Sequence, residues 1–169
     1  MKTKIIILLS ALLFNSCIAQ IQIPEDAITI TEYPAFYAQT VQKMNNIIPN
    51  KTQYYGKPLS AFLSALRQNN LIVKEYNPAP FNDNKLLIFS FLWNRFIDKP
   101  RMDKDYVKPY IYIYVQQPFD FQQASTMMST NGYHSYWNPQ AENFFKDQII
   151  EKIVFKYVGG LTNKHAADK

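Results

Sequence analysis

The segment from Tyr110 to Val115 reads YIYIYV, a strict alternation of tyrosine with an aliphatic residue. Successive side chains of a β-strand point to opposite faces, so this period of two predicts a strand with one aliphatic face and one tyrosine face. The aliphatic face has to be buried against another apolar layer. The tyrosine face, formed by Tyr110, Tyr112 and Tyr114, has two interpretations: a platform that binds a partner, or ordinary cross-strand aromatic packing.

Two segments before this strand have helical periodicity. Apolar residues that recur near a 3.6-residue period predict a helix from about Pro34 to Ile48, ended by Pro49 and Asn50. A second helix is predicted after Pro58, a residue type favoured in the first turn. Its apolar residues lie at positions i, i+3, i+4 and i+7 and form one apolar face: Leu59, Phe62, Leu63 and Leu66.

The remaining segments complete the expected fold. Three further apolar runs predict strands at 71–76, 86–93 and 149–158, and the prolines of segment 77–80 predict a rigid break after the first of them. Short helices are expected at 121–128 and 139–147, the latter with Asn138 as its N-cap. Consecutive strands with short connections favour antiparallel pairing. The sequence therefore predicts an α+β fold, with a single mostly antiparallel sheet of about four strands and helices packed on one face.

The first 19 residues have the three-part pattern of a secretory signal. Met1 to Lys4 is short and positively charged, Ile5 to Phe14 is apolar except for Ser10, and Asn15 to Ala19 contains small residues. The apolar run is shorter than the roughly 20 residues that a membrane-spanning helix needs. We therefore expect an exported protein, periplasmic or extracellular, with no transmembrane segment in its mature chain.

Two ways of processing this signal are open. Cleavage after Ala19 fits the small residues Cys17 and Ala19 and would make Gln20 the new N-terminus. Alternatively, Cys17 is a lipid attachment site and the protein is an outer-membrane lipoprotein. The expected organisation is a signal peptide at 1–19, a single α+β domain at 20–160 and a flexible polar tail at 161–169.

Charge and cysteine content narrow the classes of function. Cys17 is the only cysteine, so a chain cut after Ala19 has no disulfide, thiol nucleophile or cysteine metal site. Loss of Lys2 and Lys4 with the signal lowers the formal net charge from +5 to +3, and the other lysines are scattered. We expect no nucleic-acid partner, and interpret the charge as favouring solubility and some attraction to anionic envelope surfaces.

No cofactor or metal is expected. Asp98, Asp103 and Asp105 are close in sequence, but basic residues separate them and the spacing of a calcium-binding loop is absent. The segment Gly56-Lys57-Pro58 lacks the other residues of a phosphate-binding loop.

Aromatic residues are the main excess, at 15% of the chain, and a second cluster follows the tyrosine strand. It comprises Tyr133, His134, Tyr136 and Trp137. One interpretation is a binding surface that these residues share with Tyr110, Tyr112 and Tyr114. A second makes His134 the general base of a small periplasmic hydrolase, together with a carboxylate that the sequence does not identify. A third is a loop whose side chains fill the edge of the core.

The stretch Tyr54-Tyr55-Gly56-Lys57-Pro58-Leu59-Ser60, followed by an apolar-faced helix and a strand, resembles a pattern in small exported proteins of Bacteroidota-like bacteria that have no assigned activity. The order of helices and strands also resembles the beta-lactamase-inhibitor-like fold of some envelope proteins. Neither resemblance implies a functional residue. The leading hypothesis is a non-catalytic cell-envelope protein that binds an envelope protein or a glycan, and the alternative is the hydrolase that uses His134.

Overall fold

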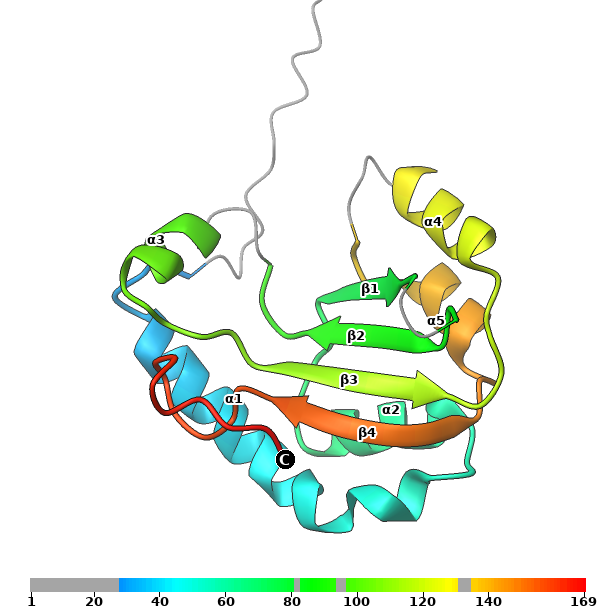
Figure 1. The fold of residues 1–169 in the computed structure, drawn as a ribbon, viewed down its shortest axis with the longest axis horizontal. Coiled ribbons are helices and arrows are strands. Elements are labelled where there is room, and N and C mark those ends of the chain that lie inside the picture. The colour runs from blue at the N-terminus through cyan, green and yellow to red at the C-terminus, as the bar shows by residue number, and fades with distance from the viewer. Residues whose placement is uncertain (1–27, 81–82, 94–96, 131–134) are drawn as a thin grey trace, which may run out of the picture.

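A computed structural model of the chain describes residues 28–80, 83–93, 97–130 and 135–169. In these residues one four-stranded sheet is combined with five α-helices and one 3₁₀-helix, η1 (Figure 1). The helices are α1 (Tyr33–Ile47), η1 (Ile48–Tyr54), α2 (Leu59–Gln68), α3 (Asp98–Asp103), α4 (Phe121–Thr130) and α5 (Pro139–Phe145). The strands are β1 (Glu75–Ala79), β2 (Leu86–Ser90), β3 (Tyr110–Val115) and β4 (Ile150–Lys156).

The sheet is an antiparallel meander in which each strand pairs with the next in the chain, in the order β1-β2-β3-β4. Its register pairs Ile88 of β2 with Tyr112 of β3, and Tyr112 in turn with Val154 of β4. This arrangement confirms the predicted α+β class with a single antiparallel sheet.

The core lies between one face of the sheet and the helices, and we call this side of the sheet the covered face. Figure 1 shows α2 behind the sheet, with α1 and η1 along the β4 side. Leu59, Phe62 and Leu66 of α2 are at most 1% exposed, because their spacing places them on one stripe that packs against the strands. From the sheet, the covered face contributes Leu87, Phe89, Ile111, Ile113, Ile153 and Phe155, all of them 0% exposed.

Several expected boundaries agree with the structure. Helix α1 covers the predicted segment, α2 follows Pro58 directly, and β3 coincides with the alternating run. The Oδ1 atom of Asn138 accepts a hydrogen bond of 2.8 Å from the backbone N–H of Ala141, so Asn138 is the N-cap of α5 as predicted.

One expectation about a break was wrong. Segment 77–80 was expected to interrupt the chain, but β1 continues through Pro78 to Ala79. Proline is tolerated there because β1 is an edge strand, where one side needs no ladder hydrogen bond. The predicted end of the first helix is confirmed, because α1 ends at Ile47, just before Pro49. Pro49 then lies in the first turn of η1, where its missing N–H has no intrahelical partner to lose.

The C-terminal residues run beside β4. The backbone groups of Phe155 and Lys169 exchange two hydrogen bonds of 2.8 and 2.9 Å, and Val158 N–H donates to the carbonyl of Ala167. The turn that leads to this segment contains Gly159 and Gly160. A Cβ atom on Gly160 would lie 2.4 Å from the Cβ of His165, so this close approach requires glycine.

Membrane-spanning helices are not found in the part of the chain that the structure describes: its helices are too short or too polar to cross a bilayer.

Candidate functional site

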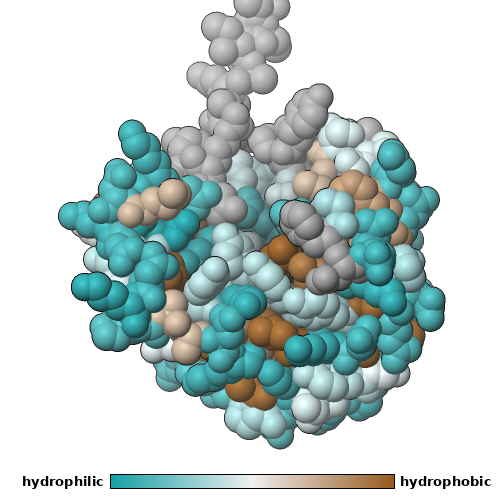
Figure 2. All heavy atoms as spheres, viewed as in Figure 1, coloured by the Kyte–Doolittle hydropathy of each residue, from teal (hydrophilic) through white to brown (hydrophobic). Residues whose placement is uncertain are grey.

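The face of the sheet that points away from α2, which we call the open face, presents twelve side chains. The register arranges them in three rows across the strands. These rows are Glu75, Ser90, Tyr110 and Lys156; Asn77, Ile88, Tyr112 and Val154; and Ala79, Leu86, Tyr114 and Lys152. In Figure 2 this side of the molecule shows small apolar patches among paler and hydrophilic residues, and its surface is hollowed between the α3 side and the α4 side.

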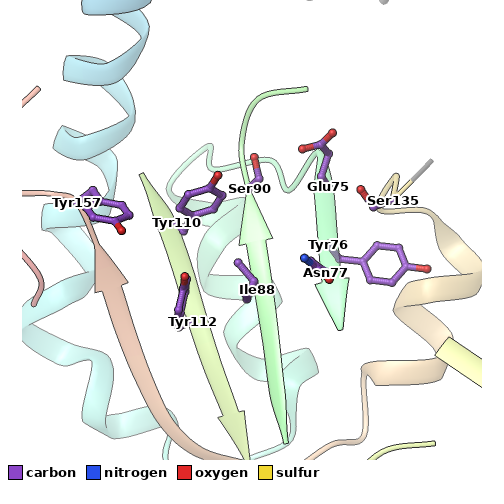
Figure 3. Close-up of a pocket in the computed structure, with 9 residues that line it drawn as sticks. All are labelled: Glu75, Tyr76, Asn77, Ile88, Ser90, Tyr110, Tyr112, Ser135 and Tyr157. Atoms are coloured by element: carbon purple, nitrogen blue, oxygen red, sulfur yellow. The ribbon is translucent and has the colours of Figure 1, made fainter. Parts of the chain in front are cut away.

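The residues that β1, β2 and β3 contribute to the first two rows form the floor of a pocket of about 310 Å³, which we call the tyrosine pocket. Its described lining residues are Glu75, Tyr76, Asn77, Ile88, Ser90, Tyr110, Tyr112, Ser135 and Tyr157. Figure 3 shows Tyr110, Tyr112 and Ile88 standing side by side on β3 and β2, with Tyr157 to one side and Ser135 to the other. The pocket therefore combines aromatic rings with hydroxyl, amide and carboxylate groups.

Tyr110 is the central ring of this pocket. Its ring centroid lies 6.4 Å from that of Tyr112 and 6.4 Å from that of Tyr157, both in edge-to-face geometry. Such contacts fix the orientation of the rings. Burial raises the pKa of Tyr110 to about 12, so its hydroxyl is neutral at physiological pH and can donate as well as accept a hydrogen bond.

A buried ion pair lies at one end of the pocket. The Nζ atom of Lys108 is 3.4 Å from Oε2 of Glu75 and donates a 3.0 Å hydrogen bond to the carbonyl of Leu92. Both side chains are almost completely buried, at 1% and 9% exposure. Burial lowers the pKa of Lys108 to about 8, although the charge of Glu75 opposes this shift. Removal of either partner would leave an uncompensated buried charge.

Lys108 also contacts a tyrosine of β3, because its Nζ lies 5.3 Å from the ring centroid of Tyr110. Ser90, in the same row, donates a 2.8 Å hydrogen bond to the carbonyl of Leu92. The chain bends at this hydrogen bond as it leaves β2. Strand β2 therefore ends at Ser90, three residues before the end of the predicted strand at 86–93. The ion pair and the hydrogen bonds thus hold the side chains of Glu75, Ser90 and Lys108 in place, so these polar groups are preorganised.

Two of the three expected tyrosines, Tyr110 and Tyr112, line the pocket. Tyr114 lies on the same face, in the third row, and is half-buried like the other two. The alternation therefore places all three on one face, as the period of two predicts.

The second aromatic cluster is divided by the sheet. Tyr136 forms a bridge with Glu75, which directs its side chain to the open face, and its ring lies 5.1 Å from that of Trp93. Trp137 packs on the opposite side, with its ring centroid 4.9 Å from that of Phe89 in the core. The structure thus does not bring Trp137 together with Tyr110, Tyr112 and Tyr114 on the open face. Tyr133, His134 and Cys17 lie outside the described residues.

Several pocket residues were not identified from the sequence. Glu75, Asn77 and Ser90 belong to short strands, and their place beside Tyr110 and Tyr112 depends on the register. Tyr157 follows β4 and has a positive φ of 57°, a backbone conformation that the neighbouring residues in the sequence do not predict. Lys108 is one of many lysines, and only its burial distinguishes it.

Among the described residues, His, Cys, Asp and Glu side chains form no group of three or more that could hold a metal ion. Asp98 is instead 3.6 Å from Arg101, and Asp105 accepts a hydrogen bond from Asn163. No protein-family model, curated protein or solved structure matches the chain.

Proposed function

We propose that this chain is an exported, non-catalytic protein of the cell envelope that binds a glycan in the tyrosine pocket. The observation that carries the proposal is the composition of that pocket: ring faces of Tyr110 and Tyr112 beside the amide of Asn77, the carboxylate of Glu75 and serine hydroxyls. A sugar has both apolar C–H faces and many hydroxyls, so it needs aromatic rings and hydrogen-bonding groups within one small site.

The position of Glu75 favours binding over hydrolysis. It is the only carboxylate among the described lining residues, and Lys108 lies 3.4 Å from it. Glycoside hydrolysis usually employs two carboxyl groups that flank the bond to be cleaved. A single carboxylate held by a buried lysine is better suited to accept hydrogen bonds from a ligand than to exchange protons with it.

A hollowed site also favours a glycan over a protein partner. Protein interfaces are usually broad, with a well-packed apolar centre. Here the aromatic rings lie within a pocket of about 310 Å³, at the lower end of the size range for small-ligand sites.

The location of the protein is inferred from its first 19 residues, whose positive start, apolar run and small residues match a secretory signal. Replacement of Leu8 and Leu12 by arginine would charge the apolar run that the export machinery recognises. We expect this variant to accumulate uncut inside the cell, as measured by fractionation and mass spectrometry. Normal export of the variant would contradict the proposed location.

Glycan binding is tested with the mature protein on an array of envelope-derived oligosaccharides, followed by calorimetry on those that bind. Asn77→Ala should weaken binding by about threefold to tenfold, because a hydrogen-bonding group is lost while the exposed position leaves the fold unaffected. Asn143→Ala, an exposed asparagine on α5 that does not line the pocket, is the matched control. Binding that Asn77→Ala does not alter, or the lack of any glycan that binds, would refute the proposal.

A further inference from the structure

Besides the contact of Lys108 with Tyr110, two lysine–tyrosine pairs on the open face join β4 to β3. The Nζ atom of Lys156 lies 5.4 Å from the ring centroid of Tyr112, and that of Lys152 lies 5.9 Å from the ring centroid of Tyr114. Both tyrosines are on β3, two residues apart, so the pairs repeat at about 7 Å along the strand. A ligand that extends from the tyrosine pocket along β3 therefore meets one pair after the other.

The first of these pairs already holds a carboxylate of the chain itself. Oδ2 of Asp168 is 2.5 Å from Nζ of Lys156, and Oδ1 of Asp168 accepts a 3.2 Å hydrogen bond from the backbone N–H of Tyr157. Burial tends to raise the pKa of Asp168, but these hydrogen bonds hold it below its usual value. A lysine beside a tyrosine ring on this face is thus an environment in which a carboxylate is bound in its charged form.

The second pair has no such partner. Among the described residues, no carboxylate lies within 4.0 Å of Nζ of Lys152, whose side chain is exposed. A second cation, Lys51, belongs to η1, the 3₁₀-helix that packs against β4. Burial and then the charge of Lys152 lower the pKa of Lys51. An anion bound at Lys152 would relieve this repulsion between the two charges.

We propose that the glycan ligand is acidic, and that Lys152 and Lys51 bind one of its carboxylates beside Tyr114 as Lys156 binds Asp168 beside Tyr112. This inference rests on the proposed function and specifies the ligand class. From Tyr110 to Tyr114 the strand spans about 13 Å, so the ligand is an oligosaccharide with uronic-acid-like units rather than a single sugar.

The experiment compares two oligosaccharides that differ only in charge: oligogalacturonate and its methyl ester. We expect the mature protein to bind the carboxylate form more tightly, and increasing salt to remove most of this preference because the ion pairs are partly exposed. Calorimetry at low and at physiological ionic strength measures both effects. Equal affinity for the two forms would overturn the inference.

Single substitutions identify the lysines that bind the carboxylate of the ligand. Lys152→Gln and Lys51→Gln should each weaken binding of oligogalacturonate by about two- to fivefold, the range of partly exposed ion pairs, and leave binding of the methyl ester unchanged. Lys104→Gln at the end of α3, also exposed, removes the same charge away from this site and should have no effect. A loss that is equal in all three variants would indicate net charge alone and would also overturn the inference.

Failure of the inference and failure of the proposed function have different signatures. If the methyl ester binds as well as the acid and Asn77→Ala weakens both, a neutral glycan site remains and only the acidic subsite is refuted. If the array, the acid and the ester all show no binding, the glycan site and its acidic subsite are both refuted.

Discussion

On the covered face of the sheet, Ile111 and Ile113 are 0% exposed beneath the helices, whereas on the open face their neighbours Tyr110, Tyr112 and Tyr114 are only half-buried. The same strand supplies both sets, one residue apart. The two isoleucines are suited to the first environment because they are wholly apolar. Tyrosine is suited to the second, because its ring can pack on a neighbour while its hydroxyl reaches water. The alternation in β3 thus encodes a core and a surface at once.

The two faces also differ in charge. Phe89 and Phe155 on the covered face contact other apolar groups, as do the other buried strand residues of that face. The open face has Lys152, Lys156 and Glu75, two of which have ion-pair partners. Ionised groups are costly to bury without partners. Glu75 is buried beside its partner Lys108, so Lys152 and Lys156 mark the part of this face that stays accessible to water or to a ligand. This difference predicts how the two faces respond to mutation.

The largest expected effect is on the covered face. Ile113→Ala should lower the free energy of unfolding by about 2–5 kcal/mol, because it removes buried methyl groups and leaves a cavity. Val154→Ala is the matched change on the open face of the neighbouring strand, where the side chain is half-buried, and should cost about 1 kcal/mol or less. Urea denaturation of both variants measures the difference. Equal losses would show that the open face is covered in solution.

Much of this comparison could be predicted from local patterns. The period of two in β3 and the apolar stripe of α2 identify buried residues such as Ile113 and Phe62 without any knowledge of the fold, because each pattern reports its own element. The antiparallel pairing of β1 with β2 follows from the short connection between them, whereas the connections from β2 to β3 and from β3 to β4 contain helices and do not fix the pairing by their length.

The site itself could be predicted only in part. Tyr110 and Tyr112 were expected on one face, but Glu75 and Asn77 reach them only through the register of β1 on β2 and of β2 on β3. A shift of register by one residue would turn these side chains to the other face, and no local pattern fixes it in such short strands. Trp137 was grouped with the tyrosines by proximity in sequence, although it packs on the core side beside Phe89.

A smaller effect is expected from the buried pair beside the open face. Lys108 has a pKa of about 8 in the folded protein, well below that of a lysine in an unfolded chain. Between pH 8 and 9.5 the unfolded state therefore binds more protons than the folded state, and the free energy of unfolding should rise with pH, on the order of 1 kcal/mol. Denaturant melts across this range measure the slope. Tyrosines of the unfolded chain begin to ionise in the upper part of the range and lower the stability of wild type and variants alike, so the slope is compared with that of a control variant.

The control for this prediction is the double variant Glu75→Gln/Lys108→Met, which removes both charges and avoids an unpaired one. Its stability should not rise over the same pH range. If the wild type and the double variant show the same pH dependence between pH 8 and 9.5, Lys108 remains fully protonated, and the pair is more hydrated than its 1% and 9% exposures indicate.

The smallest expected change in stability is at Tyr112, where the change in ligand binding should be large. Tyr112→Ser removes a half-buried ring from the open face and should lower the melting temperature by about 2–4 °C or less, because a loss of about 1 kcal/mol has this effect in a domain of this size. The same ring lines the tyrosine pocket, so glycan affinity should fall about tenfold or more, as for an aromatic contact at the centre of a binding site.

Tyr112→Phe, which keeps the ring, should retain most of the affinity if stacking on the ring dominates. A Tyr112→Ser variant that melts far below the wild type, yet binds the glycan unchanged at low temperature, would show that the ring serves packing alone. The difference between the two faces would then be one of degree of burial, without a binding site on either.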